Sequence, residues 1–102
     1  MNRPDMEQTA MEWKFDQAPN VACITSQAVL DGSPVLVVTH YGDDHSWAFL
    51  DGAGADPAQA RVVSMGSIVR LHPDVEAVAD LLPGMNAVRS AAGAAWHREA
   101  HA

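Results

Sequence analysis

The sequence predicts a single α+β domain, in which an antiparallel sheet of about four to six strands carries one or two helices on one face. Short apolar runs rich in β-branched residues recur between turn signals, which is typical of strands. The later segment DVEAVADLL instead places apolar residues at the i, i+3, i+4, i+7 spacing of a helix lying on a sheet. A length of 102 residues fits one domain, whose core needs no disulfide or metal to hold it.

The domain itself is expected over residues 13–99. Residues 1–12 are polar, carry Pro4 and show no stable period, so they predict a flexible N-terminal arm. Residues 100–102 are expected to fray, as chain ends commonly do. A hydrophobic content of 48% and a charged content of 19% are typical of a globular chain rather than a disordered one.

The first half of the domain predicts two strands separated by a helical turn. Residues 21–25 have strand composition, and the following SQAVLDGSP resembles one helical turn closed by Asp31 and Gly32. Residues 35–41 form the most apolar segment and lie between a proline and a glycine. This pattern predicts a central strand that is covered on both faces.

The stretch THYGDDHSWAFLDG predicts a β-hairpin. If residues 42–45 form a four-residue loop, His40 faces Trp47 and Val38 faces Phe49 on the neighbouring strand. His40 is then expected to stack on Trp47 across the hairpin. These pairs would fix the register of the two strands.

The second half predicts a loop, two more strands and an edge strand around the helices. Residues 51–59, DGAGADPAQ, predict a mobile loop because they combine two glycines, a proline and two aspartates. Residues 61–65 predict a third strand, and Ser67 is expected to cap a short helix that runs through Leu71. Residues 85–89 predict a returning strand, and WHRE near the end predicts a closing edge strand.

A second helix is expected to begin at Pro73, a residue favoured in the first turn of a helix. Its apolar residues Val75, Val78, Ala79 and Leu82 would then form the stripe that packs on the sheet. The dipeptide PG that follows is expected to end this helix.

The charge of the chain restricts its partners. Six basic residues stand against thirteen acidic ones, for a net charge of −7. Binding to nucleic acid depends on Lys and Arg displacing counterions, so no nucleic-acid partner is expected. An acidic surface suits a basic protein partner instead. No apolar stretch approaches the ~20 residues of a membrane span and no signal peptide is evident, which predicts no membrane association and a cytoplasmic location.

The single cysteine, Cys23, excludes an internal disulfide. It lies in the apolar run NVACIT, where a buried and unreactive thiol is expected.

One candidate site lies at the tip of the hairpin. His40, Asp43, Asp44 and His45 offer nitrogen and oxygen donors within six residues, and such donors can bind a transition metal. The spacing is only a loose match to zinc sites, which usually combine two closely spaced ligand pairs. In the competing interpretation Asp43 and Asp44 are turn formers and His45 is solvated beside them. No metal or other cofactor is therefore predicted.

Motifs of enzymes are not evident. The serines lie in no nucleophile elbow or triad context, and the chain contains neither GxGxxG nor a Walker motif. Asp43 and Asp44 are adjacent, and adjacent side chains diverge in a strand or turn, so they do not form a general acid and base pair. The chain is therefore expected not to be an enzyme.

The segments ACITSQAVLDGSPVLVVTHYGDDHSWAFLDG and VVSMGSIVRLHPDVEAVADLLPGMNAVR together resemble a bacterial family of small single-domain proteins. This is the immunity-protein-like domain of unknown function found beside polymorphic toxin systems and also as stand-alone proteins. The matching motifs are SQAVLDG and WAFLDG, which explain folding better than chemistry. The resemblance implies a non-enzymatic role, in which an acidic surface covers the active site of a basic toxin. It supplies no catalytic residues.

The resulting prediction is a cytoplasmic bacterial domain that binds another protein. Asp43, Asp44 and His45 at the hairpin tip, together with the loop 51–59, are the predicted recognition edge. Two alternatives stay open. One is a small metal-binding protein or enzyme that uses the hairpin tip with His40. The other is a structural oligomerisation module that uses Trp96 and the C-terminal strand as a sheet edge, and the chain could be a monomer or a homodimer.

Overall fold

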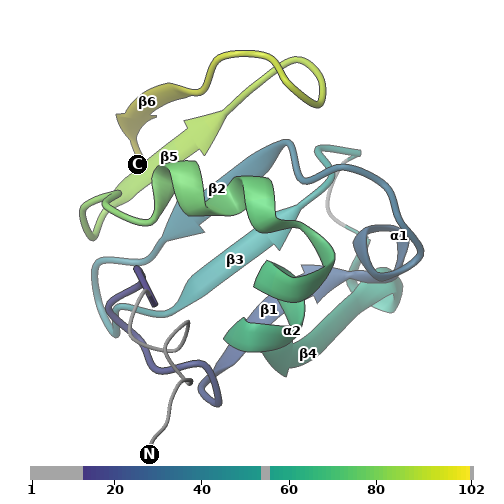
Figure 1. Ribbon diagram of the computed structural model, residues 1–102, viewed down its shortest axis with the longest axis horizontal. Helices are drawn as coiled ribbons and strands as arrows, with labels where there is room; N and C mark the ends of the chain where they lie inside the picture. Colours follow the sequence, from purple (N-terminus) through teal and green to yellow (C-terminus); the bar gives the residue numbers. More distant parts are fainter. Residues whose placement is uncertain (1–12, 54–55, 102) are drawn as a thin grey trace, which may run out of the picture.

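The computed structural model describes residues 13–53 and 56–101, and it is an α+β domain built on one six-stranded sheet (Figure 1). The predicted fold class is confirmed. The strands are β1 (Ala22–Ser26), β2 (Val37–His40), β3 (Trp47–Leu50), β4 (Ala60–Ser64), β5 (Met85–Val88) and β6 (His97–Ala100). The helices are α1 (Gln27–Leu30), the 3₁₀ helix η2 (Pro57–Gln59), α2 (Met65–Leu71) and the 3₁₀ helix η3 (Pro73–Val78). The expected N-terminal arm, residues 1–12, lies outside the described residues.

The sheet is mixed, with the strand order β4-β1-β3-β2-β5-β6. Four strand pairs are antiparallel, but β1 runs parallel to β3. The prediction of a wholly antiparallel sheet was therefore wrong for this pair. Composition and periodicity identify strands but do not say which strands become neighbours, and here β1 pairs with β3 rather than with β2, the next strand along the chain.

The predicted hairpin is present with the predicted register. His40 pairs with Trp47 and Val38 pairs with Phe49. The rings of His40 and Trp47 are stacked, with centroids 4.0 Å apart and planes inclined by 15°. These cross-strand contacts lie on the face of the sheet that α2 and η3 cover.

Both helices of the second half differ in detail from the prediction. Helix α2 begins at Met65 because the Oγ of Ser64, rather than Ser67, is the cap: it accepts the N–H of Ser67 at 3.1 Å. The segment after Pro73 is a 3₁₀ helix with about three residues per turn, so it buries residues at a spacing of three. Val75, Val78 and Leu81 are buried, whereas Leu82 is 69% exposed. The expected place of Leu82 in the apolar stripe was therefore wrong.

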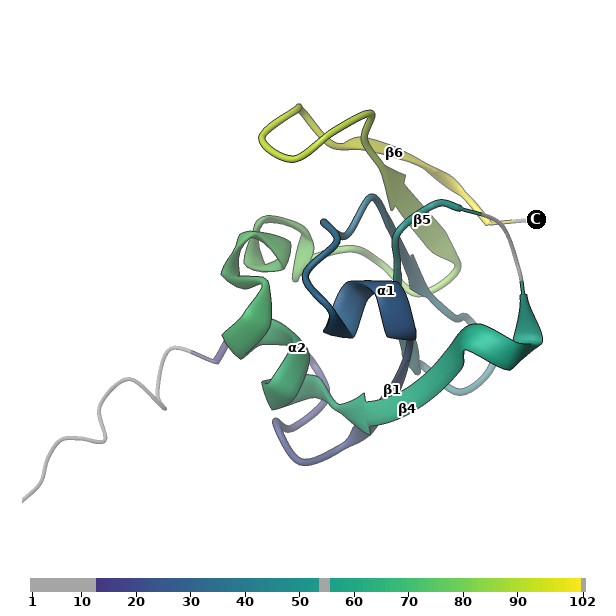
Figure 2. The same ribbon diagram turned by 90° about the vertical axis from the view of Figure 1, so that its right-hand side faces the viewer.

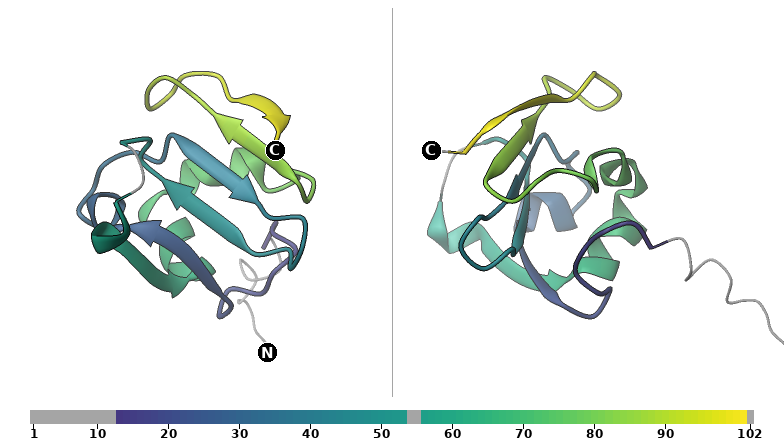
Figure 3. Two further views of the ribbon diagram at one scale, coloured as in Figure 1. Left: turned by 180° about the vertical axis from the view of Figure 1, so that it is seen from behind. Right: turned by 90° about the vertical axis from the view of Figure 1, so that its left-hand side faces the viewer.

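The two faces of the sheet are unequal. Helices α2 and η3 cover one face, and Figures 2 and 3 show that neither lies across the other. Val38 and His40 of β2 point into the core on the covered face, so alternation directs Val37 and Thr39 to the other face. The helices therefore lie on one face, as predicted, and Thr39 on the other face is nonetheless buried. β2 is nonetheless internal, since β3 and β5 flank it.

One hydrophobic core lies between the sheet and the helices. Its large members come from the segment before β1, from the hairpin and from the helices, so each element contributes to a single interior. The buried apolar side chains of this core cluster are Phe15, Cys23, Val29, Val35, Val38, Trp47, Phe49, Met65, Ile68, Val75, Val78, Ala79, Leu81 and Ala87.

The sheet extends past the boundary of residue 99 that the sequence predicts. Ala100 belongs to β6 and pairs with Met85, and the N–H of His101 donates to the carbonyl of Gly84 at 2.8 Å. The loop 51–59 contains η2, which the carboxylate of Asp56 caps. In the described part of the chain, no helix has the length and apolar character needed to span a bilayer.

Candidate functional site

Three segments that are distant in the sequence meet at one end of the sheet (Figure 1). They are residues 13–17, the β2–β3 turn and the turn at 79–84. The side chain of Gln17 donates to the carbonyl of His45 at 3.2 Å, and the N–H of Gly84 donates to the carbonyl of His40 at 2.7 Å. These bonds hold the three segments against one another.

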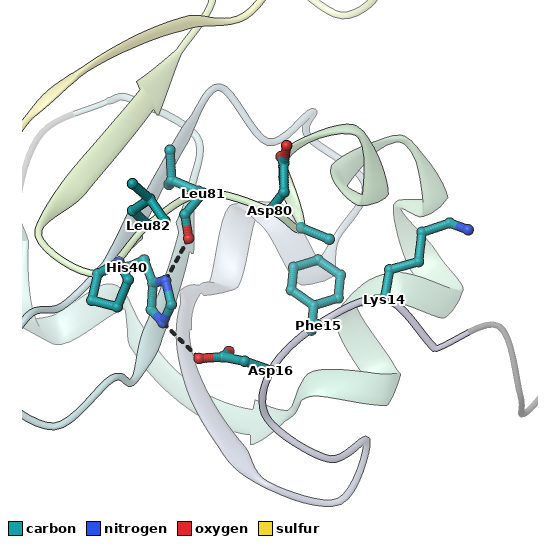
Figure 4. A pocket seen from close by; sticks show the side chains of 9 residues that line it. Lys14, Phe15, Asp16, His40, Asp80, Leu81 and Leu82 are labelled. Atoms are coloured by element: carbon teal, nitrogen blue, oxygen red, sulfur yellow. Dashed lines mark hydrogen bonds and ion pairs between the residues drawn. The ribbon is translucent and has the colours of Figure 1, made fainter.

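The three segments carry four aspartates, which we call the acidic end: Asp16, Asp43, Asp44 and Asp80. Asp16 and Asp80 line an open pocket with a volume of about 280 Å³, shown in Figure 4. Asp43 and Asp44 lie on the adjoining β2–β3 turn. The residues that line the pocket are Lys14, Phe15, Asp16, His40, Ala79, Asp80, Leu81, Leu82 and Pro83.

His40 forms the inner wall of this pocket and is only 2% exposed. Its Nδ1 lies 2.7 Å from the carbonyl oxygen of Leu81, which can only accept, so Nδ1 carries a proton. Its Nε2 lies 3.1 Å from Oδ2 of Asp16, within ion-pair distance. The geometry there does not make a hydrogen bond, and Nε2 is the one buried side-chain polar atom left without such a partner among the described residues.

Asp16 contacts the buried Trp47 with one carboxylate oxygen while its side chain remains partly exposed to solvent. Its Oδ1 accepts the indole N–H of Trp47 at 2.8 Å, while its side chain is 42% exposed. The neighbouring Phe15 fixes this position, because its ring packs edge-on against Trp47 with centroids 4.9 Å apart. The indole N–H of Trp13 donates to the carbonyl of Gln17 at 2.6 Å, and this hydrogen bond joins the two ends of the segment 13–17. Asp16 is thus a positioned carboxylate that is still accessible.

The predicted binding residues Asp43, Asp44 and His45 are all exposed and form the β2–β3 turn. A carboxylate oxygen of Asp44 accepts the N–H of Ser46 at 3.0 Å, and this hydrogen bond is the main cause that lowers the pKa of Asp44. Asp43 accepts the N–H of Asp44 at 2.8 Å. His45 has a φ of 61°, a left-handed conformation that histidine adopts only occasionally. These residues therefore shape the turn as well as presenting polar groups to solvent.

The hairpin tip does not converge on a metal. The rings of His40 and His45 lie edge to face with centroids 5.9 Å apart, but His40 is turned toward Leu81 and Asp16. Within residues 13–53 and 56–101, no group of three or more His, Cys, Asp or Glu side chains is placed to hold a metal ion.

The described residues that line the pocket include no serine, threonine or cysteine that could act as a nucleophile beside His40. Cys23 lies elsewhere, in the core, and burial raises the pKa of its thiol to about 11. The expectation of a buried thiol is confirmed.

Sequence reasoning missed two carboxylates of the site, Asp16 and Asp80. Asp16 lies close to residue 13, where the sequence predicts only the start of the domain, and Asp80 lies in the predicted second helix but outside its apolar stripe. Both come to the pocket through long-range contacts. No local pattern in either segment indicates that they share a site with His40.

No protein-family model matches the chain, and comparisons with curated proteins and with solved structures found no match. The resemblance to immunity-like domains rests on the sequence motifs alone.

Proposed function

We propose that this domain acts by binding a basic protein, without catalysis, and that the acidic end is its recognition surface. The observation that carries this proposal is the gathering of four aspartates at one end of the sheet, two of them in the walls of an open pocket. Lys14 is the one basic side chain among the described residues that line that pocket. The local charge there has the same sign as the net charge of −7.

The carboxylates of the acidic end are accessible to a partner. The side chains of Asp16 and Asp80 are 42% and 78% exposed, and Asp43 and Asp44 are also exposed. Hydrogen bonds within the domain hold these side chains in place, so a partner would not have to order them on binding. Charges of this kind speed the encounter with an oppositely charged protein and discriminate against acidic ones.

The biological role in this proposal is immunity-like: the domain covers the active site of a basic toxin. Its support is the motif resemblance and the acidic end, which complements a protein that itself binds phosphate-rich nucleic acid. The bacterial and cytoplasmic setting belongs to the same proposal.

The test is affinity capture from a lysate of the source organism, followed by mass spectrometry and by binding measurements with the purified partner. We expect a basic partner whose affinity falls steeply as salt rises. The variant Asp43→Asn/Asp44→Asn should weaken binding at least tenfold. The matched control Asp31→Asn/Asp56→Asn removes two exposed carboxylates near α1 and η2, away from the acidic end, and should bind as the wild type does.

One combination of results would contradict the protein-binding proposal. If no protein is recovered, while a metal ion raises the melting temperature by several degrees and His40→Ala or His45→Ala removes that shift, the metal or enzyme alternative replaces this proposal.

The oligomerisation alternative has one favourable observation, because all four residues of the edge strand β6 are exposed. Trp96, however, already has a partner within the domain: the guanidinium carbon of Arg89 lies 4.2 Å from its ring centroid. Light scattering over a concentration series decides the question, since a monomer at high concentration would eliminate this alternative.

A further inference from the structure

We propose that the free edge of β6 pairs with the same edge of a second copy of this chain, in an antiparallel arrangement, so that the two sheets become one. The observation that carries this proposal is a row of main-chain N–H and C=O groups on β6 that no hydrogen bond within the described residues uses. Dimer formation goes beyond the proposed function and does not depend on it, because it rests on the main chain of β6 rather than on the acidic end.

The hydrogen bond that follows β6 shows which of its main-chain groups face outward. The N–H of His101 donates to the carbonyl of Gly84 at 2.8 Å, which continues the register of β5 and β6. In an antiparallel ladder, successive residues alternate between bonding the neighbouring strand and pointing away from it. Arg98 and Ala100 lie an odd number of residues before His101, so their N–H and C=O groups point to the free edge.

The opposite edge of the sheet, on β4, is largely closed by the domain itself. The N–H of Met65 donates to the carbonyl of Val21 at 2.8 Å, so the same alternation directs Ala60 and Ser64 outward. Both outward groups of Ala60 are in use, because its N–H donates to the carbonyl at the start of η2 and its C=O accepts from Nη1 of Arg61 at 2.8 Å. Ser64 is the cap of α2, so the strand turns into a helix there. Of the two edges, β6 is therefore the open one.

The side chains of β6 leave its edge clear. The guanidinium of Arg98 reaches back over its own domain, where Nη2 lies 2.8 Å from Oδ1 of Asp80 and 3.3 Å from the carbonyl oxygen of Ala77. Both partners belong to the segment that covers the helical face, which Figure 1 shows beside β5 and β2. The strand also has no proline and no bulge, two devices that protect sheet edges in many proteins.

The charges on β6 favour a second copy as the partner. In an antiparallel pairing centred on Arg98, His97 of each copy lies opposite Glu99 of the other, on the face without helices. The two side chains share that face in one chain, with Nε2 3.7 Å from Oε1, and they are 75% and 50% exposed. An imidazole can donate a hydrogen bond to a carboxylate whether or not it is protonated. The neighbouring registers instead oppose two copies of Glu99 or two copies of His97, so the pairing centred on Arg98 is preferred.

The helical face of the junction is also compatible with this register. The two Arg98 side chains would lie opposite each other, but each is already paired with Asp80 of its own chain at 2.8 Å. Beside them, the half-buried Trp96 of one copy would face the small Ala100 of the other.

A strand pair of this length is a small interface. It offers about six main-chain hydrogen bonds, but it buries less than the ~800 Å² per partner that is typical of a stable complex. We therefore expect a weak dimer with a dissociation constant on the order of 100 μM.

The experiment combines sedimentation velocity of the full chain, from about 10 μM to about 1 mM, with amide hydrogen exchange measured by NMR over the same range. We expect a shift from monomer to dimer as the concentration rises. The N–H groups of Arg98 and Ala100 should then exchange more slowly, whereas the N–H of Val62, which points outward on β4 by the same alternation, should not change. A chain that stays monomeric at the highest concentration would overturn the proposal, and so would protection at Val62 in place of β6.

Ala100→Pro tests the main-chain pairing. It removes an outward N–H that no other group of the domain uses, so the melting temperature should fall by no more than a few degrees. The dimer should weaken at least tenfold, because a proline cannot donate to the second copy. Unchanged dimer affinity in this variant would contradict the proposal.

A charge exchange tests the register and does not depend on how well the proline variant folds. His97→Glu places a carboxylate opposite Glu99 of the second copy and should weaken the dimer about tenfold. His97→Glu/Glu99→Lys restores opposite charges across the junction and should recover the wild-type affinity to within about threefold. Gln59→Glu adds the same charge near the β4 edge and should leave dimer formation unchanged. If the single variant dimerises as the wild type does, or if the double variant does not recover, the proposal is wrong.

This proposal and the proposed function fail separately. A monomeric chain would overturn the dimer and leave binding of a basic protein at the acidic end standing. A dimer that pairs through β6 but captures no basic protein would support the dimer alone.

Discussion

Two clusters in this domain are built from the same kinds of side chain, yet they differ in one respect. Each contains a buried side chain with a planar nitrogen-bearing group, an aspartate that is about half exposed, and a tryptophan whose ring lies against that planar group. In the first cluster His40 is stacked on Trp47 and faces Asp16. In the second, Arg89 lies over the ring of Trp96, and its Nη2 donates to Asp74.

The two clusters differ in the number of N–H donors that the buried side chain can offer to the acceptors around it. The guanidinium of Arg89 is always charged, and its donors reach both the carbonyl of Val35, at 3.0 Å, and the carboxylate of Asp74. His40 has acceptors at both ring nitrogens but, when neutral, only one proton. The Arg89 cluster is therefore complete within the domain and serves stability. The His40 cluster instead leaves Nε2 without a hydrogen bond within the described residues and forms a wall of the open pocket, which is why we place the recognition surface there.

The largest effect is expected from Arg89→Ala. This change leaves the buried carbonyl of Val35 without its hydrogen-bond donor and removes the cation that faces Asp74 and Trp96. The free energy of unfolding should therefore fall by about 3 kcal/mol. Urea unfolding monitored by tryptophan fluorescence measures this. A loss below about 1 kcal/mol would mean that the Arg89 cluster is not a structural one.

A smaller loss is expected from His40→Phe. Phenylalanine keeps an aromatic ring against Trp47 but cannot donate to the carbonyl of Leu81, so the loss should be about 1–2 kcal/mol. His40→Ala also creates a cavity and should cost about 2 kcal/mol, still less than Arg89→Ala. The same urea experiment compares them. If His40→Phe were as costly as Arg89→Ala, the two clusters would be equally structural.

Arg98→Ala tests an exposed pair of the same type. Arg98 and Asp80 are 39% and 78% exposed, so solvent screens their attraction. Losing this pair should change the free energy of unfolding by less than about 1 kcal/mol. The change should also free the carboxylate of Asp80 and strengthen binding of the basic partner. Weaker binding of the partner by this variant would contradict the role given to Asp80 in the acidic end.

The smallest effect is a dependence on acid. The hydrogen bond from Arg98 lowers the pKa of Asp80, and the N–H of Ser46 lowers that of Asp44. Unfolded aspartates bind protons near pH 3.9, before these folded ones do, so the stability they contribute is present above that pH and lost as pH falls below it. The decrease in the urea midpoint between pH 7 and pH 3 should therefore be larger for the wild type than for Arg98→Ala. An equal fall would exclude the contribution of Asp80.

Much of the fold could be predicted because its signals are local. The cross-strand pairs of the hairpin follow from the loop length between two apolar runs, and the stacking of His40 on Trp47 follows from those pairs. The parallel neighbour of β1 could not be predicted, because strand order depends on packing between distant segments. The 3₁₀ geometry after Pro73 was missed for a related reason, since a spacing of three and one of 3.6 differ little over two turns.

The site was predicted only in part. The hairpin tip was predicted as a candidate site because it concentrates histidines and aspartates, and its Asp43 and Asp44 do belong to the acidic end. The donor and acceptor contacts of His40, however, come from Leu81 and Asp16, which lie far from it in the chain. A carboxylate that becomes important through tertiary contact leaves no periodic mark on the sequence.

The parallel pairing of β1 with β3 also bears on the order in which the chain folds. The β2–β3 hairpin closes a short loop and can form early, whereas β1 pairs with the other edge of β3 and has to close a longer loop. Asp16 reaches His40 through the segment just before β1, and Leu81 arrives from still later in the chain. The pocket therefore requires three segments that are distant in the chain, so fragments that lack any one of them should be unable to form it.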